Sequence, residues 1–176
     1  MIMKKLFFIL AMLLLTITTY AQGVEVNEQK NGITRISTKE YTIEFDNFFD
    51  LNIEKFISGN STQYYIRGAS EANEYHNFPP KAKMMLNLMN GNTIELTAIY
   101  TELVELREGH EWKPMAYYPI SEEQLHELFT GVKKITVEML SYNKKTDKVF
   151  TDMADIEFKK DKIGKELKAM YDNINK

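Results

Sequence analysis

Apolar and polar residues alternate over most of the chain with the two-residue period of half-buried strands. Three short segments show this alternation: residues 41–45, 53–57 and 62–67. The last two flank a turn at Gly59 and Asn60. A two-residue loop at this turn pairs Ile53 with Ile66 and is typical of a type II′ hairpin.

A second hairpin is predicted further along the chain, and its register follows from its apolar faces. The first strand carries Met84, Leu86 and Leu88, and the second carries Ile94, Leu96 and Ala98. A slip of one residue turns every side chain to the opposite face, so only a loop with an odd number of residues brings the two rows together. We therefore expect a three-residue loop that pairs Leu88 with Ile94 and puts Gly91 in the left-handed conformation. The alternation continues to Leu106, so we expect the second strand to extend that far.

Two other segments show the spacing of helices. Residues 120–131 have Ser121 in the N-cap position, Gln124 three residues later as in a capping box, and Gly131 at a suitable left-handed stop. Residues 163–174 place their apolar side chains on one helical face. The sequence therefore predicts a short capped helix and a C-terminal amphipathic helix.

The order of these elements predicts the fold class. Residues 132–140 are expected to form a strand, and residues 142–158 are expected to turn at 143–147 and return as another. Hairpins without βαβ alternation favour the α+β class, in which one antiparallel sheet is packed by the two helices. We expect a single domain over residues 33–176, preceded by a polar and flexible lead-in at residues 22–32.

The first 21 residues have the layout of a secretory signal peptide. Two lysines, Lys4 and Lys5, precede an apolar run at residues 6–15, and Thr19 and Ala21 stand at the −3 and −1 positions of a cleavage site. A membrane-spanning helix needs about 20 apolar residues, more than this run offers. We therefore predict a periplasmic or secreted bacterial protein with no membrane span after cleavage. Without a cysteine it cannot be lipid-anchored at its new N-terminus.

Composition and charge exclude several classes of function. The absence of cysteine removes thiol catalysis, zinc–thiolate sites and iron–sulfur clusters. Residues 22–130 carry 9 Lys and Arg against 17 Asp and Glu, whereas residues 131–176 carry 11 Lys against 8 Asp and Glu. This separation could steer a charged partner. Nucleic-acid binding needs a stronger basic balance than the net charge of −3 provides, so we expect neither a nucleic-acid partner nor a cofactor.

The sequence contains none of the common catalytic signatures, such as a nucleophile elbow, a phosphate-binding loop or a His-Glu-x-x-His motif. We therefore assign no catalytic residue and no metal ligand. The residues most suited to binding are Glu108, His110, Glu111, Trp112, Tyr117 and Tyr118. Carboxylates with imidazole suit a cation and indole suits a sugar, but this spacing fixes no coordination geometry. The alternative is a polar turn whose tryptophan closes one end of the sheet. Of the two adjacent tyrosines, one ring is expected in the core and the other on the surface.

Part of the C-terminal third resembles a pattern found in small exported proteins of gut-type Gram-negative bacteria. The similar segments are residues 118–125, 131–135 and 158–165. The resemblance implies a periplasmic or secreted setting and a shared fold. It supplies no catalytic residue.

These features favour a non-enzymatic, exported binding module that engages a protein or a component of the cell envelope through its sheet surface and loops. One alternative is a periplasmic inhibitor or immunity protein whose acidic face occupies a basic site. A second alternative is a glycan or peptidoglycan hydrolase that uses Glu108, Glu111 or His110, for which two carboxylates must converge at about 5–10 Å. The sequence leaves the oligomeric state open.

Overall fold

The alternating pattern folds into two antiparallel sheets, whereas one sheet was expected from the sequence. The structure is a computed structural model, and it describes residues 23–43, 49–70, 77–107, 111–143, 145–158 and 163–176. Sheet A has the order β1 (Val24–Lys30), β2 (Ile33–Thr38), β4 (Phe49–Ser58), β5 (Ser61–Ser70), β9 (Glu111–Ile120) and β8 (Tyr100–Arg107), with β3 (Tyr41–Ile43) paired to β4. Sheet B has the order β11 (Lys148–Glu157), β10 (Val132–Asn143), β6 (Lys83–Leu88) and β7 (Thr93–Thr97).

Helices α2 (Glu122–Leu128) and α3 (Ile163–Ile174) complete the fold, so the predicted α+β class is confirmed. Ser121 caps α2: its hydroxyl accepts the Gln124 N–H, and the Gln124 side chain accepts the Ser121 N–H. Gly131 follows with φ +126°. Within the described part of the chain, neither helix is long and apolar enough to cross a membrane.

The two predicted hairpins show how far sequence parity determines register. Ile53 faces Ile66 in the β4–β5 hairpin, as predicted, and Gly59 has φ +56°. In the β6–β7 hairpin the loop is odd and Gly91 has φ +92°, as expected, but the register differs by two residues. Leu86 pairs with Ile94.

The turn explains this difference in register. The Leu88 N–H donates to the Asn92 carbonyl at 2.8 Å, so the loop closes directly after Leu88. The Asn90 side chain then accepts the Asn92 N–H at 2.9 Å. Such side-chain turns of asparagine compete with the ladder, and a shift by two residues keeps every side chain on its expected face.

The long strand expected from Thr93 to Leu106 is divided between the two sheets. The Ala98 N–H donates to the Ala82 carbonyl, beside sheet B, and the next N–H, of Ile99, donates to Tyr117 in sheet A. Apolar alternation continues across this point, so the sequence alone does not reveal the change of partner. Residues 24–30, expected within a flexible lead-in, form β1 and pair with β2.

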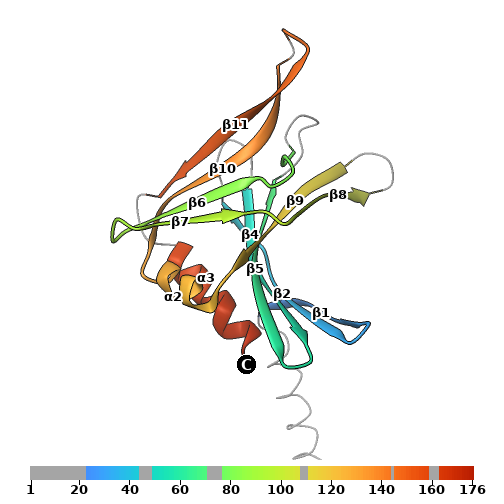
Figure 1. Ribbon diagram of the computed structural model, residues 1–176, viewed down its shortest axis with the longest axis vertical. Coiled ribbons are helices and arrows are strands. Elements are labelled where there is room, and N and C mark those ends of the chain that lie inside the picture. Colours follow the sequence, from blue (N-terminus) through green and yellow to red (C-terminus); the bar gives the residue numbers. More distant parts are fainter. Residues whose placement is uncertain (1–22, 44–48, 71–76, 108–110, 144, 159–162) are drawn as a thin grey trace, which may run out of the picture.

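One continuous hydrophobic core lies between sheet A on one side and sheet B with the two helices on the other, as Figure 1 shows. Sheet A contributes Leu51, Ile53, Ile66 and Tyr118; sheet B contributes Met84, Leu86, Ile135 and Val137; the helices contribute Leu125, Leu128, Ile163 and Leu167. We call this side of sheet A the inner face and the opposite side the outer face.

Candidate functional site

The outer face of sheet A carries charged side chains that are nearly as buried as the core. On β4, Leu51 and Ile53 point into the core, and the residues between and beside them point outward. Those outward residues are Asp50, Asn52 and Glu54, and they are 5%, 0% and 0% exposed. Burying a charge is costly unless it is paired, so the partners of these side chains determine what the face can do.

Glu54 is held by a two-pronged ion pair. Arg35, on β2, donates from Nε to one carboxylate oxygen at 3.0 Å and from Nη2 to the other at 2.8 Å. This geometry is the strong form of an arginine–carboxylate contact. The pKa of Arg35 is raised chiefly by the hydrogen bond to Glu54, so the guanidinium stays charged.

Arg67, on β5, connects β4 to the loop after β2. Its Nε donates to the Asn52 side-chain oxygen at 2.8 Å, and its Nη2 donates to Glu40 at 2.8 Å. The Asn52 amide in turn donates to the Ser37 hydroxyl at 2.8 Å. The strands β2, β4 and β5 therefore all contribute polar side chains to a single layer.

Lys113, on β9, closes the layer on the far side. Its ammonium donates to Glu40 and, at 2.7 Å, to Asp50. Burial, the largest single influence, acts to lower the pKa of Lys113, but the hydrogen bonds to Asp50 and Glu40 and the negative charges of these carboxylates together raise it by more, so the pKa is higher than usual. The other oxygen of Asp50, Oδ1, is buried and has no hydrogen-bond partner within the described residues.

Beside this charged layer lies a pair of tyrosines. The rings of Tyr100 on β8 and Tyr117 on β9 lie 5.8 Å apart, and the Tyr117 hydroxyl donates to Glu102 at 2.7 Å. Burial, followed by the hydrogen bond to Glu102, raises the pKa of the Tyr117 hydroxyl, which therefore stays a donor. Tyr117 is half-buried and Tyr100 is 57% exposed.

The edge strand β8 and the residue before it expose three large apolar side chains, which we call the β8 rim: Ile99, Tyr100 and Leu103. They are 64%, 57% and 46% exposed. The register of β8 against β9 turns Tyr100 to the outer face with Tyr117 and Leu103 to the other side of the strand. In the described part of sheet A, β8 pairs only with β9, so its other edge is open. An open edge strand that exposes apolar side chains is a template for binding another polypeptide.

The described side chains of the outer face carry a small excess of negative charge. The cations Arg35, Arg67 and Lys113 face five carboxylates, namely Glu28, Glu40, Asp50, Glu54 and Glu102. Lys30 lies on the same face, because its partner Ile33 is two residues from Arg35, so the difference is one negative charge. Glu28 and Glu102 lie on the opposite edge strands β1 and β8.

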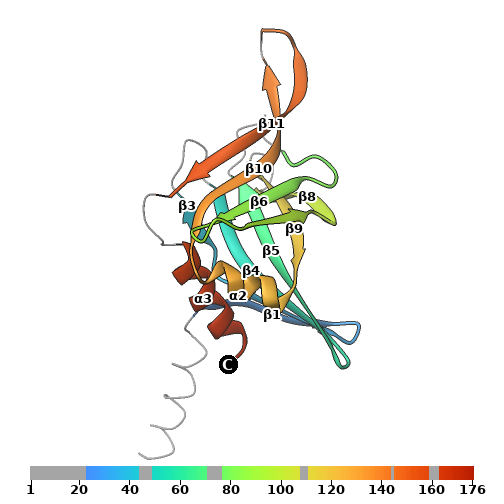
Figure 2. The same cartoon turned by 60° about the vertical axis from the view of Figure 1, so that its left-hand side comes forward.

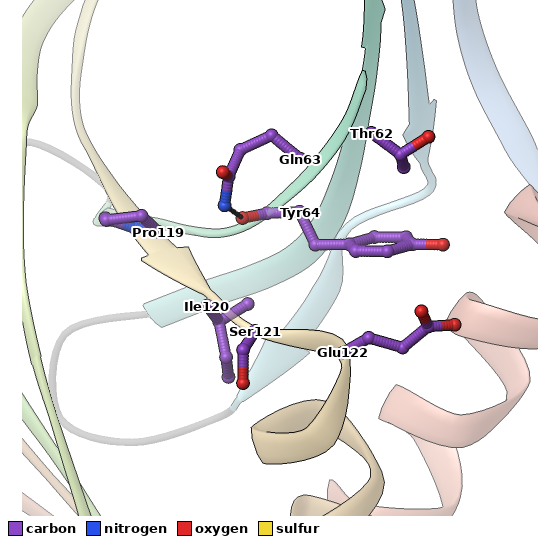
Figure 3. A pocket seen from close by; sticks show the side chains of 7 residues that line it. All are labelled: Thr62, Gln63, Tyr64, Pro119, Ile120, Ser121 and Glu122. Atoms are coloured by element: carbon purple, nitrogen blue, oxygen red, sulfur yellow. Dashed lines mark hydrogen bonds between the residues drawn. The ribbon is translucent and has the colours of Figure 1, made fainter. Parts of the chain in front are cut away.

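A shallow pocket of about 400 Å³ lies elsewhere, where β5 and β9 meet the start of α2, as Figure 3 shows. Three of its polar side chains already have partners. The Tyr64 hydroxyl donates to Asn175 at 2.9 Å, Glu122 accepts from the Tyr171 hydroxyl, and Ser121 caps α2. The first two contacts dock the C-terminal helix α3, so these side chains serve the fold.

The structure separates the sequence-predicted binding residues. Tyr117 lies on the outer face, as just described, but Tyr118 is 0% exposed in the core, and its hydroxyl has no partner within the described residues. Strand alternation turns Tyr118 inward, as expected for one ring of this pair, so Tyr117 is the one of the two that can reach a partner. Glu108 and His110 lie outside the described residues. Glu111 and Trp112 belong to β9, and nothing is described of their side chains.

Most of the outer-face residues escaped the sequence analysis. Arg35, Glu54 and Arg67 are far apart in the sequence and form no motif, so only the pairing of β2, β4 and β5 brings them together. The available signal was the polar half of each alternating strand, which normally indicates a solvated face. Among the described residues, no three His, Cys, Asp or Glu side chains gather in a way that could hold a metal ion.

Comparisons with known proteins give this site no precedent. A scan against models of protein families, a search of curated proteins and a search of solved structures each found no match to this chain.

Proposed function

We propose that this chain is an exported, non-enzymatic binding module, and that it engages a protein of the cell envelope through the β8 rim and the adjoining outer face of sheet A. The observation that carries the proposal is the open, apolar edge of β8, where Tyr100 lies beside Tyr117 on the outer face and Leu103 is exposed on the other side of the strand. Aromatic and aliphatic side chains beside anchored charges suit a polypeptide partner.

The chemistry of the outer face supports binding over catalysis. The carboxylates of Glu40, Asp50 and Glu54 each contact a cation, and the Tyr117 hydroxyl is committed to Glu102. A nucleophile or general base needs a free lone pair directed at the substrate. These groups instead serve as counter-ions and hold one another in place. The one carboxylate oxygen without a partner among the described residues, Asp50 Oδ1, is buried and out of reach of a substrate.

The aliphatic members of the rim favour a protein over a glycan. Tyrosine rings stack on sugars and on proteins alike, but Ile99 and Leu103 offer no hydrogen bond to a sugar hydroxyl. The carboxylate of Glu102, on β8 itself, favours a segment with basic side chains. This charge also suits the inhibitor or immunity interpretation, in which the partner presents a basic site; a toxin gene adjacent in the genome would support that version.

The binding half of the proposal is tested by capture from envelope extract with matched variants. Replacing Tyr100 and Leu103 together with serine should abolish recovery of the partner while leaving the free energy of unfolding nearly unchanged. Met89→Ser is the control, because Met89 is 43% exposed but lies in a turn of sheet B. A partner recovered equally well by all three proteins would contradict the proposal.

The export half is tested by fractionation and N-terminal sequencing of the protein from its host. We expect a chain that begins at Gln22 in the periplasm or the medium. An intact chain in the cytosol would contradict this half and leave the geometry of the rim unaffected.

A further inference from the structure

The second exposed apolar strand of the molecule is β11, at the edge of sheet B. In the described part of the chain, β11 pairs only with β10, and its residues 148–153 are all exposed. Three of them are large apolar side chains: Val149, Phe150 and Met153. An open edge with this composition is a template for pairing with another strand.

The start of β11 is complementary to itself when it is read in the opposite direction. Its sequence is Lys148, Val149, Phe150, Thr151, Asp152. In an antiparallel pair of two copies centred on Phe150, the two phenylalanines face each other and Val149 faces Thr151. Lys148 then faces Asp152 of the partner copy at both ends of the pair. Aromatic pairs, β-branched pairs and opposite charges are the favourable cross-strand combinations.

Symmetry removes most other registers. Facing residues of an antiparallel pair point to the same side of the sheet, so a two-fold axis permits only registers centred on one residue. A pair centred on Thr151 places Phe150 opposite Asp152, and a pair centred on Asp152 places two like charges opposite each other. Like charges in facing positions are unfavourable. The register centred on Phe150 is therefore the complementary one among these neighbours.

The side chains and the shape of the hairpin leave this pairing open. Neither Lys148 nor Asp152 forms an ion pair with another side chain among the described residues. The β10–β11 hairpin extends beyond the rest of the molecule in both views (Figures 1 and 2). Two copies of the chain that overlap at residues 148–152 would meet near the tips of their β10–β11 hairpins. The rest of each copy would lie on opposite sides of this contact.

We propose that β11 binds β11 of a second copy of this chain, antiparallel and centred on Phe150. Two four-stranded sheets would then form one eight-stranded sheet across the two-fold axis. Main-chain hydrogen bonds of strand addition supply the affinity, and the Lys148–Asp152 pairs supply the register. Five residues from each copy make an interface smaller than that of a typical stable dimer, so we expect association that depends on protein concentration.

The test is sedimentation equilibrium of the natural protein over a wide concentration range, with charge-exchange variants. Lys148→Asp and Asp152→Lys each place like charges opposite each other twice, so each should weaken dimerisation by on the order of tenfold. The variant with both changes restores opposite charges and should recover the wild-type dimerisation constant. Glu157→Lys is the control, because Glu157 lies on β11 outside the overlap.

Two results would overturn the proposal. The first is a wild-type protein that stays monomeric at every concentration tested. The second is a dimer whose stability is the same in all four variants, since that dimer would use another surface. Neither result bears on the β8 rim, which lies on sheet A and is tested by partner capture.

Discussion

The centres of both faces of sheet A are buried, one by apolar side chains and the other by paired charged side chains. On the inner face, Leu51 and Ile53 are buried among other apolar side chains. On the outer face, Asn52 and Glu54 are equally buried, among arginine, lysine and carboxylate groups. A buried apolar face stabilises the fold by leaving water, whereas a buried ionic layer is stable only while each charge keeps its partner.

The difference shows what each face can contribute. The inner face tolerates changes of shape at a moderate cost, because apolar contacts are not directional. The outer face fixes the positions of its side chains through directed contacts, and thereby holds Tyr117 and the β8 rim in place. We infer that the inner face stabilises sheet A and that the outer face determines which partner the surface of the sheet can bind.

The largest expected effect is the loss of one charge from the buried layer. Glu54→Ala removes the carboxylate that pairs with Arg35 and lies 3.5 Å from Arg67, so it should lower the free energy of unfolding by about 3–5 kcal/mol. Glu28→Ala is the matched control, because Glu28 contacts the same Arg35 at 3.9 Å but is 67% exposed in its side chain. Its cost should be below about 1 kcal/mol. Equal costs in urea denaturation would mean that the outer face is open to solvent.

The next effect concerns the inner face. Gly68 lies on β5, where an added Cβ would come within 2.9 Å of the Phe49 ring. Gly68→Ala should therefore cost about 1–2 kcal/mol, despite the lower backbone entropy of alanine. In the double variant with Phe49→Leu, the smaller side chain leaves room for the added methyl group. The double variant should therefore lose less free energy of unfolding than the sum of the two single variants. A Gly68→Ala protein that is more stable than the wild type would contradict the close packing.

A smaller effect should distinguish two adjacent tyrosines on opposite faces. Tyr117→Phe loses the hydrogen bond to Glu102 and should lower the free energy of unfolding by about 0.5–1.5 kcal/mol. Tyr118→Phe removes a buried hydroxyl that has no partner among the described residues, so it should be neutral or stabilising. Thermal or urea unfolding of the two variants checks this contrast, and a reversed order would refute it.

The smallest effect is a pH dependence. The pKa values of Tyr117 and Lys113 are raised above their ordinary values of 10.0 and 10.5. The folded state then holds these protons more tightly than the unfolded state does. The resulting stabilisation is present below about pH 10 and is lost as the pH rises through the raised pKa values.

Urea denaturation between pH 8 and pH 11 checks this sign. The free energy of unfolding should fall at the alkaline end, and it should fall less steeply in Tyr117→Phe than in the wild type. A stability that rises in this range, or an identical slope in both proteins, would show that Tyr117 does not titrate as described.

The sequence predicted the hydrophobic core well and the outer face poorly. Alternation put Met84, Leu86 and Leu88 on one apolar face, and all three are buried. The pairing of Ile53 with Ile66 followed from one turn. The same alternation left Glu54 on the polar side, which ordinarily means solvent. Its burial depends on Arg35 and Arg67 from other strands, and no local pattern carries that information.

Two further differences have the same origin. The division between β7 and β8 depends on which carbonyl groups accept the N–H groups of Ala98 and Ile99. A row of apolar side chains can pack in either sheet, so the sequence pattern is the same for both. Alternation predicted that Tyr117 and Tyr118 lie on opposite faces, but which ring enters the core depends on the pairing of β9 with β5. These features therefore depend on the pairing of strands that are far apart in the sequence, which a local pattern does not reveal.

The most direct test of the central claim is a hydrogen-exchange comparison of the protein alone and with the partner captured from envelope extract. We predict that the amides of β8 and β9, around Tyr100 and Tyr117, exchange more slowly when the partner is bound, while the amides of β10 and β11 keep their exchange rates. Protection confined to sheet B, with β8 and β9 unchanged, would contradict it.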